Sequence, residues 1–392
     1  MVSPEFPPDL QGGLGTHVAE LIARLLERIK VDAVVPASEH RTLFHPALAM
    51  LPIEVDGARG YEGYWLRFCA EAVRQFRYGP QRSFDIVHCH DWLTVLAGIG
   101  LRALTHRPLV FSIHLPQVRD VNIDIENLGL AYADRVLVNS EAVKRELATR
   151  DVTSQIVVIP NGVDLNVFTP VRGAKAMSPT VLFVGRLTAQ KGVDVLLQAL
   201  VVLMDKVRDV HLVIAGDGDQ FLYLRRLARH LGVPARVTFA GWQTGNDLVK
   251  LYQDAWAVAI PSMYEPFGIV SLEAMACARP VVASRTGGLS EVIEDGRSGY
   301  LVDPGDHLML AQRLALLLTD RTRAKQMGAE ARRRAEQYDW DRIAGLVSQE
   351  YDSVLSGPMA VPDRKAHRFV SALLRNAAED SRPIAESLVR DL

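Results

Sequence analysis

The feature that most constrains the fold is a regular alternation of short apolar segments, glycine-containing loops and amphipathic helical segments. Segments rich in Val and Ile predict two series of strands, the first at 86–88, 109–113, 135–138 and 156–159 and the second at 180–185, 210–215, 237–240, 257–261 and 280–284. Helical patterns intervene at 92–105, 140–150, 193–206 and 221–231. Strands that alternate with helices form parallel sheets covered on both faces. The sequence therefore predicts an α/β fold with two doubly wound, Rossmann-like domains facing each other across a cleft.

The domain boundaries follow from a break between the two series. The stretch 169–179 contains two prolines and a glycine without hydrophobic periodicity, so we interpret it as a linker. We predict an N-terminal domain at 1–168, a C-terminal domain at 180–337, a helix at 338–356 and a polar tail at 357–392. Ligands of doubly wound sheets bind at the carboxyl ends of the strands, so the chemistry is expected in the loops there.

The start of the chain departs from this pattern. A helix expected from about Leu14 should follow a buried strand, but only Met1, Val2 and Ser3 precede the turn at Pro4. A strand normally has about five or six residues. We therefore expect either an unusually short first strand or a start that truncates it.

Charge and composition limit the class of function. The 392 residues include 44 Lys and Arg against 46 Asp and Glu, which gives a net charge of −2 and argues against a sequence-independent nucleic-acid binder. No apolar stretch is long enough to cross a bilayer, and no secretory leader is expected. The three cysteines have no paired spacing for a zinc site or a disulfide framework. We expect a cytoplasmic protein and leave its oligomeric state open.

The segment from Glu265 to Glu273 is the most specific motif. It follows an apolar strand, and Gly268 opens a helix within it. Both carboxylates can therefore contact a ligand bound at the carboxyl end of the strand, where they would accept hydrogen bonds from sugar or ribose hydroxyls. The amides near Gly268, Ile269 and Val270 could meet a diphosphate at the helix start. The alternative is one acid that favours the helix dipole and one surface acid.

Two cations lie where the first strand of the second series ends. Arg186 and Lys191 are separated by a loop whose length lets both converge on one anion. Arginine offers a planar fork and lysine a compact charge, which suits a diphosphate leaving group. The alternative is a pair of exposed loop cations.

Polar groups also end two neighbouring strands of the first series. His114 follows the strand at 109–113, and His90 and Asp91 end the strand before it. Residues at adjacent strand ends belong to one wall of the expected cleft. A single histidine there can also be structural, which is the interpretation preferred for His88.

Glycine loops add two weaker signals. Gly12, Gly13 and Gly15 lie between a turn and a helix, where their amides could approach an anion or simply form a tight turn. Gly216 follows the second strand of the second series, where it forms a turn or packs against a nucleotide.

Together these motifs resemble those of the retaining GT-B glycosyltransferases of family 4, leaning toward glycogen and starch synthases, over about residues 2–355. The resemblance rests on Pro4-Glu5-Phe6-Pro7-Pro8 before the glycine loop, His90-Asp91-Trp92, Asn161-Gly162-Val163-Asp164, Gly185-Arg186 with Lys191-Gly192, and Glu265 with Glu273. It implies a nucleotide-diphospho-sugar donor, expected to be ADP-glucose or UDP-glucose, and a terminal helix that crosses back to the first domain.

The resemblance also implies residue roles. Glu273 would bind the ribose and Glu265 the transferred sugar, while Arg186 and Lys191 would neutralise the diphosphate with help from amides at Gly268 to Val270 and Gly13. His114 would contact the sugar near its primary hydroxyl, and His90 and Asp91 would lie on the acceptor side. No enzymic nucleophile and no metal would be needed, because a donor phosphate oxygen would take the acceptor's proton on the same face.

Two departures weaken a specific glycogen synthase assignment: Leu10 stands where a lysine is common, and Leu115 where an asparagine is common. The expected reaction is hexose transfer, with glucose the expected sugar, to a glucan or a small sugar or sugar-phosphate acceptor. The alternatives are a transferase with a lipid-linked acceptor, a non-catalytic nucleotide-sugar-binding protein and a phosphate-binding epimerase. Residues 1–170 carry 16 basic and 20 acidic residues, which gives no support to a lipid surface.

Overall fold

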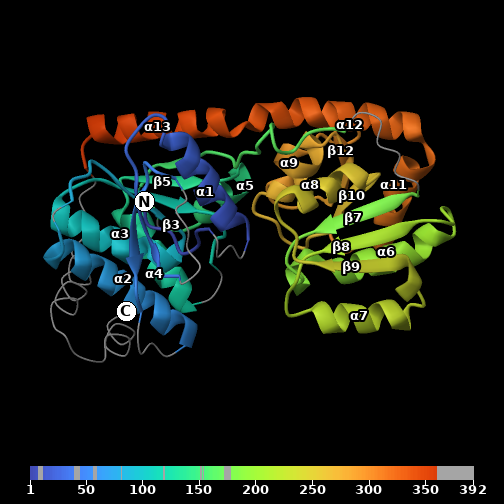
Figure 1. Ribbon diagram of the computed structural model, residues 1–392, viewed down its shortest axis with the longest axis horizontal. Helices are drawn as coiled ribbons and strands as arrows, with labels where there is room; N and C mark the ends of the chain where they lie inside the picture. Colours follow the sequence, from blue (N-terminus) through green and yellow to red (C-terminus); the bar gives the residue numbers. More distant parts are fainter. Residues whose placement is uncertain are drawn as a thin grey trace. The chain divides into compact units, whose positions relative to one another are not determined.

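The computed structural model describes residues 1–7, 12–38, 45–55, 60–80, 82–117, 120–150, 152, 154–171 and 178–359, except the side chains of 120 and 121. The chain forms two compact units (Figure 1): unit 1 contains Met1–Pro160 and Ile343–Leu392, and unit 2 contains Asn161–Arg342. Positions 172–177 of the expected linker, 360–392 of the expected tail and 8–11 before the glycine loop lie outside the described residues.

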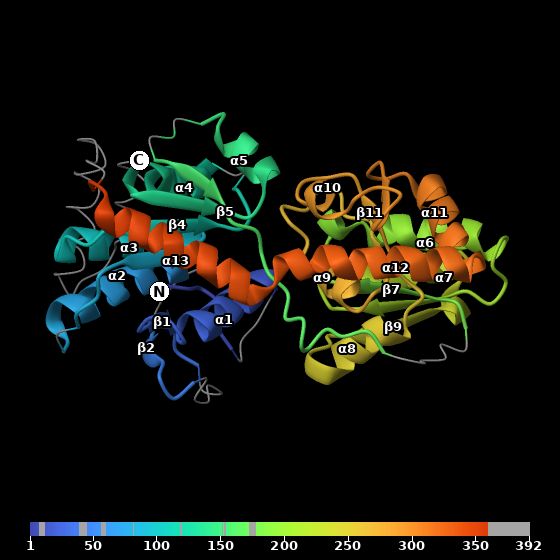
Figure 2. The ribbon, with the colours of Figure 1, turned by 90° about the horizontal axis from the view of Figure 1, so that it is seen from above.

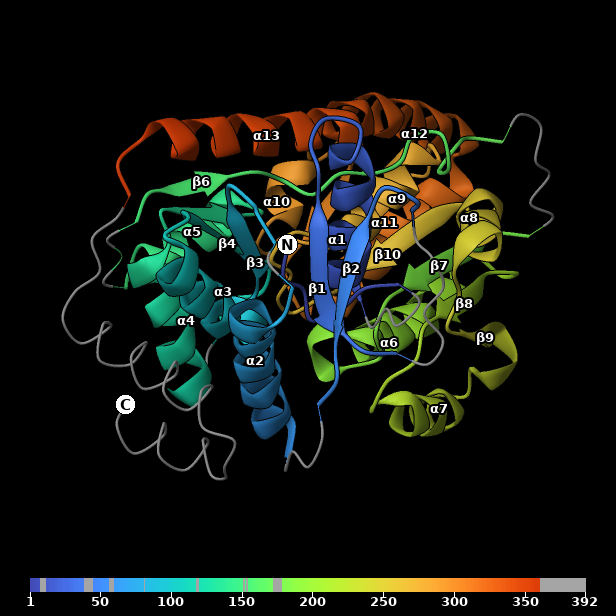
Figure 3. The same cartoon turned by 60° about the vertical axis from the view of Figure 1, so that its left-hand side comes forward.

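Unit 1 is built on parallel strands. They are β1 (Asp32–Pro36), β2 (Ala49–Ile53), β3 (Val87–His90), β4 (Leu109–Ile113), β5 (Arg135–Val138) and β6 (Ile156–Val158). Strands β3 to β6 pair in sequence order, and β1 pairs with β2 beside it (Figure 3). Buried apolar side chains of these strands contact helix residues such as Trp65 and Val95 in one continuous core.

The first three residues take the place of a strand between β1 and β3. Val2 forms parallel bridges with both Val34 and Cys89. Its amide donates to the His88 carbonyl at 2.8 Å, and its carbonyl accepts from the His90 amide at 3.2 Å. The segment before the helix is thus a very short piece of central sheet.

The helices of unit 1 are α1 (Gly13–Leu25), α2 (Gly60–Tyr78), α3 (Trp92–Thr105), α4 (Asp120–Tyr132), α5 (Glu141–Leu147) and the larger part of α13 (Trp340–Ser356). Ser140 caps α5 by accepting from the Val143 amide at 3.2 Å. Helix α13 lies along unit 1 (Figures 1 and 2), where the Tyr351 hydroxyl lies 2.6 Å from Nδ1 of His88. This bond fixes His88 in a structural position.

Unit 2 contains a six-stranded parallel sheet in the order β9-β8-β7-β10-β11-β12. The strands are β7 (Thr180–Val184), β8 (His211–Ala215), β9 (Val237–Gly241), β10 (Ala257–Ile260), β11 (Val281–Ser284) and β12 (Gly299–Val302). This is the doubly wound order, which reverses between β7 and β10; sheets of this kind bind their ligands at the carboxyl ends of the strands at such a switch point.

Helices cover both faces of this sheet. One set comprises α6 (Val193–Met204), α7 (Phe221–His230) and α11 (His307–Thr319), and the other α8 (Gly245–Asp254), α9 (Ile269–Ala276) and α10 (Leu289–Val292). Helix α12 (Arg321–Ala335) contributes to both cores, through Ala324 and Ala331 respectively. Alternate residues of β7 divide between the two cores: Val181 and Phe183 pack with the first set, and Leu182 with the second. The predicted α/β class with parallel sheets is confirmed.

Candidate functional site

The loops after β7 and β10 meet at the switch point of unit 2. The Lys191 ammonium lies 2.7 Å from Oε2 of Glu265, and the Ser262 hydroxyl donates to the same oxygen at 3.0 Å. Lys191 ends a short 3-10 helix, η1 (Ala189–Lys191). A cation and a carboxylate predicted from separate motifs therefore lie together.

Backbone contacts hold these two loops against each other. The Met263 amide donates to the Gln190 carbonyl at 2.8 Å, and the Gln190 side chain donates to the Tyr264 carbonyl at 3.0 Å. Gly192 has a φ of 63°, and a Cβ there would lie 2.1 Å from the Pro261 carbonyl oxygen. Only glycine fits this approach, which places Lys191 beside the carboxyl end of β10.

Arg186 follows β7 and is exposed. Within the described part of the chain, its guanidinium has no ion pair. Gly216, which follows β8, packs against this turn, because a Cβ there would lie 1.9 Å from the Gly185 carbonyl oxygen. Its amide donates to the Gly241 carbonyl at 2.8 Å, so Gly216 shapes the loop rather than offering a free donor.

Helix α9 begins at the same edge of the sheet. Gly268 is its N-cap with a φ of 93°, and the amides of Ile269 and Val270 lie in its first turn. The first N–H groups of a helix have no intrahelical acceptor, and the helix dipole favours an anion there. A second glycine loop supports this start, because the Gly288 amide donates to the Glu265 carbonyl at 3.1 Å.

Glu273 lies in α9 and is buried. The hydroxyl of the fully buried Tyr252, from α8, donates to its Oε2 at 2.6 Å. Burial, reinforced by the Glu273 charge and hydrogen bond, raises the pKa of Tyr252 well above its usual value. Tyr252 therefore acts as a permanent donor that fixes one oxygen of Glu273.

In unit 1, the backbone of His114 is held from both sides. Oδ1 of Asp91 accepts from its amide at 2.7 Å, and the Asn139 side chain donates to its carbonyl at 3.0 Å. Asp91 has an unusual φ of 58°, and burial raises the pKa of its carboxyl to about 8. These contacts fix the backbone of His114 at the carboxyl end of β4.

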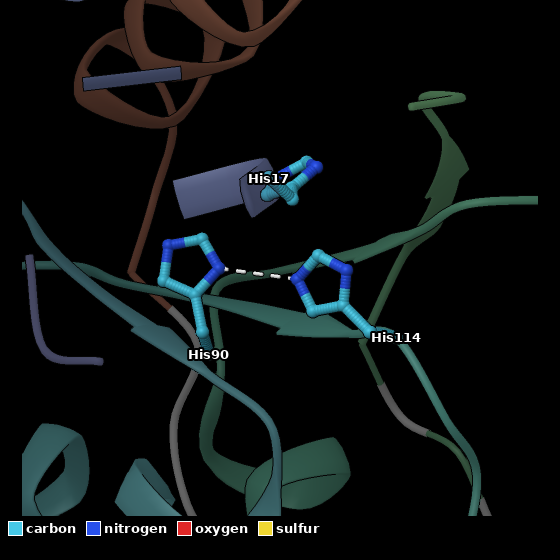
Figure 4. A group of neighbouring side chains, drawn as sticks. All are labelled: His17, His90 and His114. Atoms are coloured by element: carbon cyan, nitrogen blue, oxygen red, sulfur yellow. Dashed lines mark hydrogen bonds between the residues drawn. The ribbon is translucent and has the colours of Figure 1, made fainter. Parts of the chain in front are cut away.

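Three histidines from three elements gather at this point (Figure 4). Nδ1 of His90 lies 3.2 Å from Nε2 of His114, and the His17 ring from α1 meets His114 edge-on with centroids 4.4 Å apart. Burial, and then the neighbouring histidines, lower the pKa of His90 and His114 well below 6.5. The three donor nitrogens lie within 4.8 Å of one another, a set that could hold a metal ion.

The glycine loop at the start of α1 is occupied from within the chain. The Gly15 amide donates to a carboxylate oxygen of Glu5 at 3.2 Å, while Gly12 is the N-cap and Gly13 the first residue of the helix. An internal carboxylate thus lies at the helix start, where the sequence predicted approach to a ligand anion. Leu10, one of the two departures from the family pattern, falls outside the described residues.

Sequence reasoning missed several residues that position the site. They are His17, Asn139, Tyr252, Ser262 and the Gly287-Gly288 pair. In the sequence, Tyr252 looks like any core residue of an amphipathic helix, and Asn139 looks like a residue that caps the end of a strand. Neither pattern points to a functional site. Of the missed residues, the Gly287-Gly288 pair, which follows a predicted strand, is the one that a local sequence pattern could have indicated.

Family models match both halves of the chain. Residues 11–167 match the model for Glycosyltransferase Family 4, and residues 168–334 match that for Glycosyl transferases group 1. Among the described residues, no helix combines the length and hydrophobicity needed to cross a bilayer.

Several named proteins are similar over most of their length. An uncharacterized glycosyltransferase of Methanocaldococcus jannaschii is 32% identical, covering 88% of this chain and 95% of the relative. D-inositol 3-phosphate glycosyltransferase of Salinispora tropica is 31% identical, covering 88% and 82%. Glycogen synthase of Mycobacterium tuberculosis is 30% identical, covering 90% and 93%.

Solved structures share the architecture. Sucrose-phosphate synthase from Thermosynechococcus elongatus has a TM-score of 0.80 at 25% identity, covering 91% of this chain and 99% of that one. Anabaena HepE, solved in complex with UDP-glucose, has a TM-score of 0.75 at 22% identity, covering 90% and 100%, which shows the fold. The chain therefore belongs to the family 4 glycosyltransferases and is a glycogen synthase-like member with the GT-B fold.

Proposed function

We propose that the protein transfers a hexose, glucose in the first instance, from a nucleotide-diphospho-sugar to a glucan or to a small sugar or sugar-phosphate acceptor. The anomeric configuration is retained, and no metal takes part in the transfer. The observation that carries this proposal is the juxtaposition of Lys191, Glu265 and the start of α9 at the switch point of unit 2.

The diphosphate is assigned to the cations and amides at this edge. Arg186 is exposed and has no ion pair within the described residues, so its guanidinium is available to a phosphate. Lys191 contacts Glu265 and can share its charge between that carboxylate and the ligand. The amides of Ile269 and Val270 add donors at a helix start. Together these groups supply the neutralisation that other transferases obtain from a metal.

The sugar and ribose are assigned to the two carboxylates. Glu265 has one oxygen engaged by Lys191 and Ser262, which leaves its other oxygen for hydroxyls of the transferred sugar. Glu273 is fixed by Tyr252 and is assigned to the ribose. His114 is assigned to the primary hydroxyl of the sugar, following the family resemblance.

The reaction follows from these assignments. The acceptor hydroxyl attacks the sugar from the same face from which the leaving diphosphate departs. A phosphate oxygen of the donor accepts the hydroxyl's proton, so no nucleophile of the enzyme forms a bond to the sugar. The chain's contribution is positioning and stabilisation of leaving-group charge, for which removal of one preorganised group costs about 3–4 kcal/mol in related chemistry.

The similar proteins support the choice of substrates. HepE was solved with UDP-glucose, which supports UDP-glucose as the donor, while ADP-glucose follows from the family resemblance. Sucrose-phosphate synthase and D-inositol 3-phosphate glycosyltransferase carry phosphorylated small molecules in their names, and glycogen synthase a glucan. These names favour the two acceptor classes equally.

A panel of nucleotide sugars tests the proposal. Diphosphate release is measured with UDP- and ADP-linked hexoses, with and without glucan, glucose phosphate and inositol phosphate. The expected result is acceptor-dependent release from at least one donor, with an α-linked product from an α-linked donor by NMR. An inverted product, or release that requires added Mg²⁺ after chelation, would overturn the mechanism.

A further inference from the structure

The histidine cluster of unit 1 is more elaborate than recognition of one hydroxyl requires. His17 comes from α1, His90 from the end of β3 and His114 from the residue after β4 (Figure 4). His17 and His90 are buried and His114 is half-buried. A fourth histidine, His88, stacks on His90 with centroids 4.2 Å apart, but both of its nitrogens are engaged by Tyr351 and Ser112. His88 therefore supports the cluster without offering a further ligand atom.

The spacing of the nitrogens matches a metal site. Tetrahedral zinc binds imidazole nitrogens at about 2.0–2.1 Å, which sets neighbouring ligand nitrogens about 3.3 Å apart. Nδ1 of His90 and Nε2 of His114 are 3.2 Å apart and form a hydrogen bond (Figure 4), whose proton a bound ion would replace. The donor atoms of all three residues lie within 4.8 Å of one another. The close pair is already at the separation that a bound ion would impose.

We propose that His17, His90 and His114 bind a divalent transition-metal ion, zinc in the first instance, and that the bound ion inhibits the enzyme. Three imidazole nitrogens with an open fourth position form a known type of zinc site. Imidazole also suits Cu²⁺ and Ni²⁺, whereas Mg²⁺ and Ca²⁺ prefer oxygen ligands. The site thus selects borderline transition metals against the hard cations.

The surroundings of the cluster restrict its movement. The backbone of His114 is bonded by Asp91 and Asn139, and the His90 amide donates to Oγ1 of Thr94 at 3.0 Å. Such fixation reduces the entropy lost when an ion is bound.

Inhibition follows from the double use of His114. An ion on Nε2 of His114 removes that nitrogen from sugar recognition, so this part of the inference rests on the proposed function. The transfer itself needs no metal, and the ion acts as a brake. Metal binding and inhibition are therefore measured separately.

Binding is tested on the full chain without any substrate. Calorimetry with ZnCl₂ after chelator treatment should show one strong site, and ¹⁵N NMR should show shifts at three imidazoles. His17→Gln and His90→Gln should each lower zinc affinity at least tenfold, and Mg²⁺ should give no heat. His230→Gln, an exposed position on α7, is the matched control and should bind as the parent does. No imidazole shift in the parent, or equal affinity in all three variants, overturns the site whether or not the enzyme transfers sugar.

Inhibition is tested with the donor and acceptor found active. Zinc should lower the parent rate with a midpoint equal to the calorimetric Kd, and His17→Gln should shift that midpoint at least tenfold relative to its own zinc-free rate. An unchanged midpoint in His17→Gln overturns inhibition through this cluster. An inactive parent with intact zinc binding would contradict the proposed function and leave the metal site standing.

Discussion

The Lys191 ammonium lies 2.7 Å from Oε2 of Glu265, across 74 positions of sequence. Both side chains are largely shielded, with 18% and 11% of their surfaces exposed, so the pair is stronger than a surface ion pair. Two groups assigned to one ligand thus hold each other in place. Under the proposed assignment, a diphosphate bound at Lys191 would share the lysine's charge with Glu265, which would couple recognition of the phosphate to recognition of the sugar.

Removal of Arg186 separates activity from stability. Arg186→Ala should lower kcat/KM by about a hundredfold to a thousandfold because it removes one charge that stabilises the leaving group. Its free energy of unfolding should be unchanged, since the guanidinium has no ion pair within the described residues. Steady-state kinetics and urea denaturation measure the two. Lys206→Ala, exposed in the same unit, is the control, and a parent-like rate in Arg186→Ala would remove this residue from the site.

Lys191→Ala should lower both the activity and the free energy of unfolding, unlike Arg186→Ala. We expect a similar loss of kcat/KM together with about 1–3 kcal/mol of destabilisation, because Glu265 is left without its cation. The double variant with Glu265→Gln should recover part of the stability and none of the rate. Recovery of the rate in the double variant would show that Lys191 serves only to neutralise Glu265.

The buried Tyr252 hydroxyl offers a test of the ribose assignment. Tyr252→Phe keeps the packed ring but removes the donor to Glu273, so nucleoside-diphosphate affinity should fall about three- to tenfold. Glu273→Gln should weaken the same binding. Calorimetry with UDP and ADP measures it, and Tyr223→Phe, at an exposed tyrosine, is the control. Equal affinities in all variants would place the ribose elsewhere.

The contact between Gly216 and Gly185 predicts a strong requirement for glycine. Gly216→Ala should lower the free energy of unfolding by about 1–3 kcal/mol, because the added methyl would lie 1.9 Å from a carbonyl oxygen. Gly232 has a φ of 75°, but an added Cβ there would have no atom within 4 Å, so Gly232→Ala isolates the cost of backbone strain. If urea denaturation gives the two variants the same stability, the close approach does not exist in solution.

Glu126 predicts a pH dependence of stability. Its buried carboxyl accepts from Arg150 at 2.6 Å and from the Gln117 amide at 3.1 Å, yet burial outweighs both and raises its pKa above 4.5. Between the unfolded and the folded pKa, the folded chain therefore binds more protons than the unfolded chain. The contribution of Glu126 to the free energy of unfolding is thus present below pH 4.5 and is lost as the pH rises through the raised pKa. Glu126→Gln should flatten the fall in stability over that window, as measured by urea denaturation at several pH values. Parallel curves for the parent and variant would contradict the shift.

The strands with compact apolar runs were predictable from sequence. Segments 109–113 and 135–138 coincide with β4 and β5, because both are bounded by turn or polar residues. Strands β1, β2 and β12 were not predicted, because β1 and β2 contain a proline, Pro36 and Pro52, and β12 begins with Gly299. Strand β3 extends to His90, two residues beyond the predicted end, because its pairing with β4 continues to Ser112.

The positions of the proposed donor-site residues were predictable where they lie close to a strand end. Lys191, Glu265 and Glu273 each follow a strand in a loop or helix start, and strand order alone brings two of them together. His17, Asn139 and Tyr252 could not be predicted, because their partners lie on other elements and depend on helix orientation. The Glu5 carboxylate at the Gly15 amide is a similar long-range contact.

A crystal structure of the protein with a bound nucleoside diphosphate tests the central claim most directly. We predict the β-phosphate within hydrogen-bond distance of Arg186 and Lys191 and of the amides that open α9, with the ribose on Glu273. A diphosphate bound away from these groups, with Lys191 still paired only to Glu265, would contradict the account.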